Sequence, residues 1–137
     1  MRIIRLPGIH HDANAVIFAG NESSVLVDAG TTWYQMLQVE RISGHLGERK
    51  LSKILLTSRR YPFSGAAKYI SENNGNIPIH IHEDAISVLQ TGDFYSTWAN
   101  RYDSDIPSTD CVHVTQGDQF KLGDGSITAL SLPGHCP

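Results

Sequence analysis

Short apolar runs separated by turn residues open the chain. Runs of this length that are rich in β-branched side chains are typical of strands, and they cover residues 2–6, 15–19 and 24–28. The Gly-Asn-Glu-Ser sequence at 20–23 is a turn signal between the second and third runs. We therefore predict that the chain begins with antiparallel strands.

Helical spacing follows at once. Apolar side chains recur at steps of three and four residues before Gly47, at Met36, Val39, Ile42 and Leu46. Thr31 or Thr32 can cap the N-terminus of this helix. Gln38 falls on the other, polar face. The pattern thus predicts an amphipathic helix with one side against a core.

Strands and helices then alternate. Strand patterns at residues 53–57 and 77–81 are each followed by a helical pattern, at residues 64–75 and 83–90. This β-α-β-α order lies between two segments that are mainly β.

The last third of the chain combines a loop with short strands. Residues 91–110, the aromatic loop, are mostly polar but carry Phe94, Tyr95, Trp98 and Tyr102. We expect these rings to form a local packing cluster, with a lid or contact surface as the alternative. Strand patterns separated by glycine turns end the chain and predict an antiparallel meander; they cover residues 111–114, 119–122 and 126–132.

Composition narrows the class of protein. The 137 residues suit one domain, 1–137, and 40% of them are apolar while 18% are charged. A net charge of −3 provides no basic field, so we expect neither a nucleic-acid nor a membrane partner. No secretory signal or membrane span is recognisable, so we expect a cytoplasmic protein. Cys111 and Cys136 are too few for a disulfide framework, and we expect reduced thiols.

Six short stretches of the sequence, taken in their order along the chain, resemble those of a known family. They are Asn14 before VIFAG, VLVDAG, ILLT followed after seven residues by Gly65, IHIHEDA, QGDQFKLGDGSITAL and LPGHCP. Each is weak alone, but together they resemble the metallo-β-lactamase superfamily, the glyoxalase II-like hydrolases. This resemblance implies an α/β (α+β) fold, an αββα sandwich of two mixed sheets with helices on both outsides. It also implies a cleft at the strand ends.

The resemblance breaks down at the metal ligands. Members of the family carry THxHxDH, which binds one or two ions, usually zinc, where this chain has TSRRYPF at residues 57–63. The four ligand positions hold Ser58, Arg60, Pro62 and Phe63. Serine is a poor ligand, arginine is a permanent cation, and the other two side chains have no lone pair. A guanidinium near a dication is repelled by on the order of 8 kcal/mol, so we expect no metal cofactor here.

Histidines elsewhere remain as candidate ligands: His10, His11, His80, His82 and His135. His135 falls at the family's next histidine ligand, but one imidazole does not hold zinc, and we expect a turn residue. His80 and His82 lie two apart in a strand and so point to one face. In the family His82-Glu83 would open a surface helix. Asp28 supports the metal loop in the family, but we expect it to cap the next helix.

The sequence ends before the family domain does. The resemblance covers about the first two-thirds of such a domain, so we expect a C-terminally incomplete fold after the PGH motif. An apolar sheet face or edge would then lack its cover. We therefore expect either a homo-oligomer with two-fold symmetry or another chain that completes the fold.

Three functions of different class follow. We favour a non-catalytic protein that acts by binding or assembly. The alternative is a metal-dependent hydrolase of small thioesters, lactones or esters that uses a non-standard zinc ligand set drawn from the histidines. The third is a small-anion site at the cleft, where Arg59 or Arg60 replaces the lost positive charge beside a helix start. Its candidate ligand-binding residues are Ser58, Arg59, Arg60 and His135.

Overall fold

A six-stranded mixed sheet forms the centre of the computed structural model, which describes residues 1–130. Its strands are β1 (Arg2–Leu6), β2 (Ala15–Ala19), β3 (Ser24–Val27), β4 (Lys53–Leu55), β5 (Ile79–His82) and β6 (Val112–Val114). They lie in sequence order, antiparallel from β1 to β3 and parallel from β3 to β6. A separate antiparallel hairpin is formed by β7 (Gln119–Lys121) and β8 (Ser126–Thr128).

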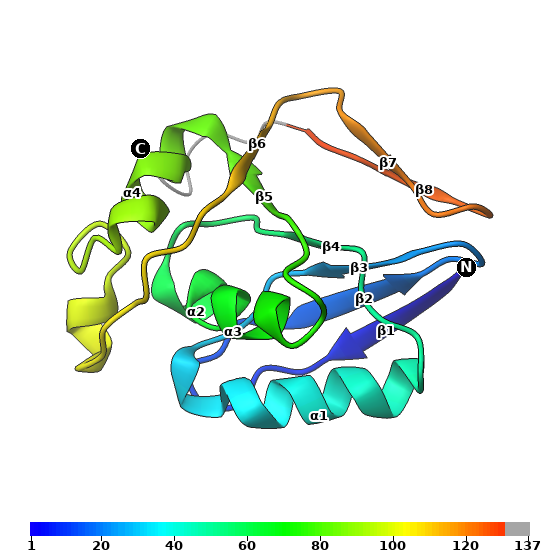
Figure 1. The fold of residues 1–137 in the computed structure, drawn as a ribbon. Coiled ribbons are helices and arrows are strands. Elements are labelled where there is room, and N and C mark those ends of the chain that lie inside the picture. Colours follow the sequence, from blue (N-terminus) through cyan, green and yellow to red (C-terminus); the bar gives the residue numbers. More distant parts are fainter. Residues whose placement is uncertain (131–137) are drawn as a thin grey trace.

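The first three α-helices and the hairpin lie on opposite faces of this sheet (Figure 1). The α-helices are α1 (Gln35–Leu46), α2 (Tyr61–Ser64), α3 (Ala67–Glu72) and α4 (Ile86–Thr91). Short 3-10 turns are η1 (Thr32–Tyr34), η2 (Glu83–Ala85) and η3 (Ala99–Tyr102). The first three α-helices pack below the sheet in Figure 1, and β7–β8 lies above it. No helix within residues 1–130 has the length and apolar character of a membrane span.

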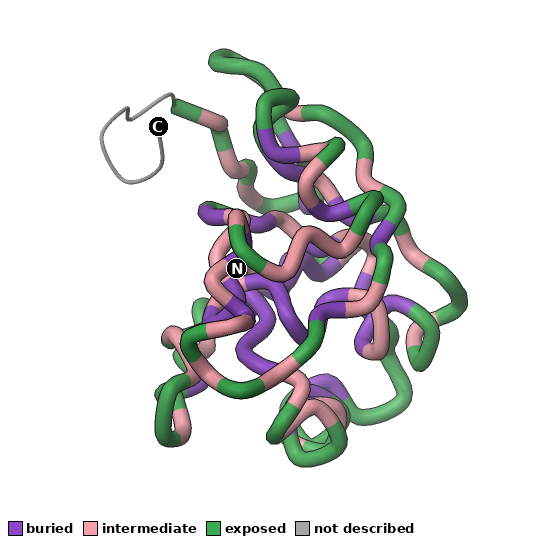
Figure 2. Tube along the Cα trace, turned by 90° about the vertical axis from the view of Figure 1, so that its left-hand side faces the viewer, coloured by how far each residue is buried: buried purple, intermediate pink, exposed green. Residues whose placement is uncertain are grey.

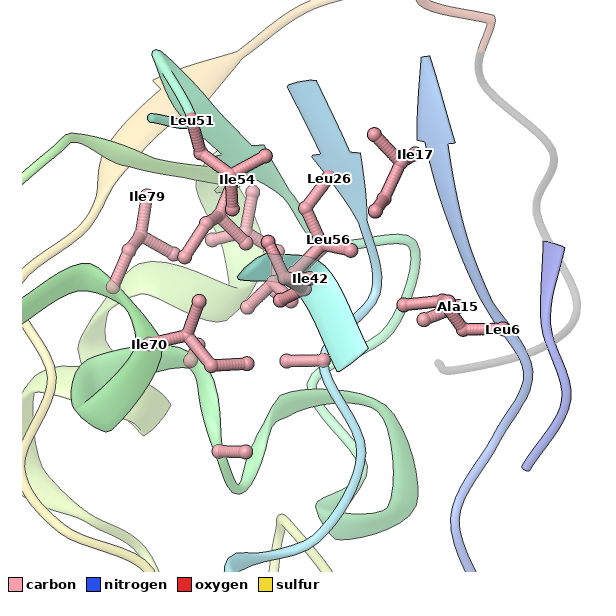
Figure 3. Packing of buried hydrophobic residues seen from close by; sticks show 14 of the residues in the cluster. Leu6, Ala15, Ile17, Leu26, Ile42, Leu51, Ile54, Leu56, Ile70 and Ile79 are labelled. Atoms are coloured by element: carbon pink, nitrogen blue, oxygen red, sulfur yellow. The ribbon is translucent and has the colours of Figure 1, made fainter. Parts of the chain in front are cut away.

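The core lies between the sheet and its helices. One side chain from each of four neighbouring strands forms a buried row by cross-strand pairing: Ile17, Leu26, Ile54 and Ile79. Helical side chains from α1 and α3 close over this row (Figure 3). Each such burial stabilises the fold by about 1.5–3 kcal/mol. Figure 2 shows the buried residues gathered at the centre, with exposed loops around them.

The predicted α/β class and the antiparallel start are confirmed. The predicted meander is wrong for β6, which pairs in parallel with β5, whereas β7 and β8 pair as expected. A strand of three residues makes few ladder bonds, so its position is set by the sheet it joins. In the described residues the second sheet is therefore an antiparallel hairpin and not a mixed sheet.

The predicted face of α1 is also partly wrong. Met36 is 69% exposed, while Gln38 is buried and its Nε2 donates to the carbonyl oxygen of Ala29 at 3.0 Å. Ile42 and Leu46 are buried as expected. The turn η1 precedes the helix, so α1 begins at Gln35 and presents a different stripe to the core. The backbone carbonyl needs a donor, and the glutamine supplies it.

Replacing Ile54 tests the position of the core. Ile54→Ala should lower the free energy of unfolding by about 2–5 kcal/mol, because its side chain is fully buried between two helices and the sheet. Urea unfolding measures this change. Met36→Ala is the matched control and should change stability by about 0.5 kcal/mol or less. Similar losses in both variants would contradict this core.

Candidate functional site

Two strand ends are joined by a buried carboxylate. Asp28, at the end of β3, has a φ of 64° and accepts from the backbone N–H of Thr57 at 2.9 Å and from its hydroxyl at 2.7 Å. Burial raises the pKa of Asp28 from 3.8 to about 6, and the two hydrogen bonds from Thr57 oppose this rise. The predicted capping role of Asp28 is therefore wrong. Thr31 caps η1 instead, accepting from the N–H of Trp33.

Residues 57–63, the strand-end loop, are held mainly by their own backbone. Ser58 is buried, and its hydroxyl oxygen accepts from the N–H of Arg60 at 3.1 Å. The carbonyl of Pro62 accepts from Ala13 at 3.0 Å, and the carbonyl of Phe63 accepts from Ala29 at 2.8 Å. These bonds fasten the loop to the loops that follow β1 and β3. The helix expected at residues 64–75 is divided into α2 and α3, and α2 already begins at Tyr61.

Tyr61 is the fully buried residue of this loop. Its hydroxyl bonds both the N–H of Thr32, at 3.1 Å, and the Thr32 hydroxyl. Its own N–H donates to the carbonyl of Thr97 at 2.6 Å. A Cβ at Gly65 would lie 2.7 Å from the Tyr61 ring, so only glycine leaves room for it there. The side chain and backbone of this one residue thus connect three loops at the strand ends.

The two arginines of the loop have different surroundings. The Nε of Arg59 donates to the carbonyl of Ser96 at 3.3 Å. The pKa of Asp93 is lowered mainly by its hydrogen bonds from backbone N–H groups, and the charge of Arg59 adds to this. The guanidinium carbon of Arg60 lies 3.6 Å from the ring centroid of Trp98. Arg59 therefore fastens the aromatic loop, and Arg60 stacks on it.

Arg101 is a neighbour that the sequence did not indicate. Its guanidinium carbon lies 4.2 Å from the same Trp98 ring. Only the turn geometry of the aromatic loop brings these residues together, so no spacing or motif could have predicted the contact. Two cationic groups thus contact one indole beside the strand-end loop.

His10 and His11 lie in the loop after β1, where their rings are 5.4 Å apart in an edge-to-face contact. The ring of His11 also lies 5.1 Å from that of Tyr102 and 5.6 Å from that of Trp33. The next residue, Asp12, is occupied by Thr31, whose N–H and hydroxyl donate to it at 2.9 and 2.5 Å. This group is an aromatic cluster, and Asp12 beside it accepts both hydrogen bonds on Oδ1.

His80 and His82 lie elsewhere, on the face of β5 opposite the core, as their spacing predicted. The ring of His80 contacts Phe120 at 5.2 Å, and its buried Nε2 has no hydrogen-bond partner within residues 1–130. Burial lowers the pKa of His80, and the charge of Lys53 lowers it further. Nδ1 of His82 accepts from the N–H of Asp84 at 3.2 Å and opens η2, which is the role implied by the family resemblance.

The residues at the family's metal positions do not fit zinc. Ser58 is engaged with the backbone, Arg60 brings a positive charge, and neither Pro62 nor Phe63 offers a side-chain donor. In the part of the chain that the structure describes, no three His, Cys, Asp or Glu side chains are close enough to hold a metal ion. His135 and Cys136 lie outside the described residues.

The aromatic loop contacts Arg59, Arg60 and Tyr61 of the strand-end loop. Phe94 and Tyr102 pack against the core, as the expected packing cluster requires, whereas Tyr95 is 72% exposed. The indole N–H of Trp33 donates to the hydroxyl of Ser104 and links the loop to η1. The loop is thus both a packing element and part of the cleft surface.

Comparison with known proteins identifies the architecture. No family model and no curated protein sequence matches the chain. Among solved structures, BJP-1, a subclass B3 metallo-β-lactamase of Bradyrhizobium japonicum, matches with a TM-score of 0.77 and 22% identity over 90% of this chain and 47% of that one. A Cronobacter sakazakii metallo-β-lactamase with a HARLDQ motif matches with a TM-score of 0.77 and 20% identity, over 100% and 55%. The chain has the metallo-β-lactamase fold.

A third likeness agrees with this assignment. FEZ-1-Y228A, a mutant metallo-β-lactamase from Legionella gormanii, matches with a TM-score of 0.76 and 15% identity, over 92% of this chain and 49% of that one. The chain spans about half the length of these structures. The structural similarity establishes the metallo-β-lactamase fold. The sequence identities are too low to establish an activity.

Asp28 makes the stability depend on pH. Below about pH 4 its carboxyl is neutral in the folded and unfolded chains, and above about pH 6 it is ionised in both. Between these values the folded state binds more protons, so its contribution to stability should fall by up to about 3 kcal/mol as the pH rises. The substitution Asp28→Asn supplies an amide side chain that tolerates the same backbone angle and does not titrate.

Urea unfolding of wild type and Asp28→Asn from pH 3.5 to 7.5 measures this contribution. The stability of the variant relative to wild type should rise between about pH 4 and pH 6. The difference cancels the titration of the other carboxylates, including Asp93 and Asp124, whose pKa values are lowered. A difference that is flat with pH would contradict a raised pKa for Asp28.

Proposed function

We propose that this chain is a metal-independent binding domain built on the metallo-β-lactamase fold. The observation that carries the proposal is the use of the strand-end loop for internal contacts. Ser58 bonds the backbone, Tyr61 connects three loops, and Arg60 stacks on Trp98. A domain of this kind binds a partner or ligand at its cleft without activating a water molecule.

Electrostatics support this proposal. Arg60 stands at the second ligand position implied by the family resemblance, so a dication there would face a guanidinium at short range. Moving Arg60 away would break its contact with Trp98, which is worth about 0.5–2 kcal/mol. The buried hydroxyl of Ser58 is a weak neutral ligand, so it compensates neither for the repulsion between Arg60 and a dication nor for the loss of the Arg60–Trp98 contact.

Metal analysis of the purified protein tests the proposal. The protein should retain far less than one equivalent of zinc or iron per chain, both as isolated and after incubation with excess zinc followed by desalting. Mass spectrometry of metal content, normalised to protein concentration, provides the value. One or two retained equivalents would favour the alternative, a hydrolase of small thioesters, lactones or esters with a non-standard ligand set.

Assembly forms the second part of the proposal. The face of the central sheet opposite the helices carries an apolar group beside the polar side chains of Arg5, Lys53, His80 and His82. The apolar members are Ile3, Val16, Phe18, Val25, Val27, Leu55, Val112 and Val114. The hairpin β7–β8 reaches this face through Phe120 and Leu122 and covers only part of it. Ile3 remains 66% exposed and Val112 remains 46% exposed.

A second copy of the chain suits this face. Apolar sheet faces require a cover, and a copy related by two-fold symmetry presents a face of the same chemistry and area. Two such faces pack at about 10 Å from one another, as in other sheet sandwiches. We propose a homodimer formed in this way.

Light scattering after size-exclusion chromatography tests the dimer. Wild type should have the mass of two chains, and Ile3→Lys or Val112→Lys should shift it toward one chain, because a charge at this face opposes burial. Met36→Lys, on the exposed side of α1, is the matched control and should leave the mass unchanged. A single-chain mass for wild type at all concentrations would refute the dimer.

A further inference from the structure

Two guanidinium groups share one aromatic ring at the cleft. Those of Arg60 and Arg101 lie 3.6 and 4.2 Å from the ring centroid of Trp98. Within residues 1–130 the ion pairs are Met1–Asp124 and His82–Asp84, so no carboxylate there neutralises either arginine. Neither side chain makes a hydrogen bond to another described residue. Two guanidinium groups against one ring, neither of them in an ion pair with a described carboxylate, favour an anion from solution.

The backbone at this ring is in an unusual conformation. Trp98 has a φ of 66° and Asp103 has a φ of 49°, angles that side chains other than glycine rarely adopt. The preceding residue, Thr97, is fully buried, and its hydroxyl donates to the carbonyl of Asp93 at 2.5 Å. The backbone N–H of Tyr61 also donates to the carbonyl of Thr97. Strain held in place by such contacts is typical of binding sites.

An aromatic surface adjoins the two arginines. Tyr102 directly follows Arg101, and its ring contacts His11, which in turn contacts Trp33. Trp33 is 46% exposed, and its indole N–H is bound to Ser104. An apolar ligand body placed beside Trp98 could therefore cover these rings and remove them from water.

We propose that Arg60 and Arg101 bind the carboxylate or phosphate group of a small organic acid whose apolar body lies beside Trp98, against the adjoining aromatic rings. Guanidinium groups suit such oxyanions because their N–H donors match two oxygens at once. This ligand class deepens the proposed binding function and rests on it. Arg59 does not take part, because its Nε is committed to Ser96.

Tryptophan fluorescence offers a direct test, since the chain contains two tryptophans. The probes are phenyl phosphate, inorganic phosphate and neutral benzyl alcohol, titrated at low salt. Phenyl phosphate should change the emission saturably and bind more tightly than inorganic phosphate, while benzyl alcohol should bind weakest. The variant Trp33→Phe serves only to assign the signal to Trp98.

Single-charge variants test the residues. Arg60→Gln and Arg101→Gln should each weaken phenyl phosphate binding by about tenfold or more, because each removes a charged hydrogen-bond donor. Arg2→Gln removes one exposed charge from edge strand β1 and should leave the dissociation constant unchanged. If Arg60→Gln does not fold, Arg60→Lys keeps the charge, loses the planar fork and should still weaken binding.

The outcomes separate this inference from the proposed function. No saturable binding, or equal binding by wild type and both arginine variants, would overturn the anion site. Equal weakening by Arg2→Gln would overturn it too, because the effect would then be one of net charge. Equal affinity for phosphate and phenyl phosphate would overturn the role of the rings. Metal content is measured on the same preparation, and retained zinc would refute the proposed function itself.

Discussion

The arrangement of the loops at the strand ends depends on the hydrogen bonds of the buried residue Tyr61. A phenol hydroxyl inside a protein must be hydrogen-bonded, and the N–H and hydroxyl of Thr32 meet this need. The backbone of Tyr61 meanwhile fixes Thr97 in the aromatic loop. Because these contacts reach two other loops, the side chain and backbone of Tyr61 together position the strand-end loop. The arginines then take their places relative to this fixed point.

This arrangement explains how the fold is kept without the family's ligand residues. A metal ion connects loops by attracting their side chains, whereas here the connections run through backbone groups and the tyrosine. The carbonyls of Pro62 and Phe63 bind neighbouring loops, and Asp28 holds Thr57 at the end of β4. In our proposal the positive charge of an ion is replaced by guanidinium groups at the surface of the cleft. In this proposal the domain binds anions and does not activate water.

Much of the fold could be predicted because its signals are local. Turn residues and apolar runs indicated β1 to β3, and the alternation that follows was clear from its periods. The pairing of β6 could not be predicted, since three residues carry little register information and their partner is distant in sequence. Gln38 is buried because its side chain donates to the backbone carbonyl of Ala29. Arg101 contacts Trp98 because the backbone of Trp98 is in the left-handed conformation. Periodicity encodes neither of these.

The most direct test of the account is the urea unfolding midpoint of the purified protein, measured with a chelator and again with excess zinc. If internal contacts around Tyr61 hold the loops, the two midpoints will agree within error. A ligand that binds only the folded state raises the free energy of unfolding, and the increase grows with the logarithm of the ligand concentration once this exceeds the dissociation constant. A midpoint that falls with chelator and rises with zinc concentration would therefore show that an ion holds these loops, and it would contradict the account.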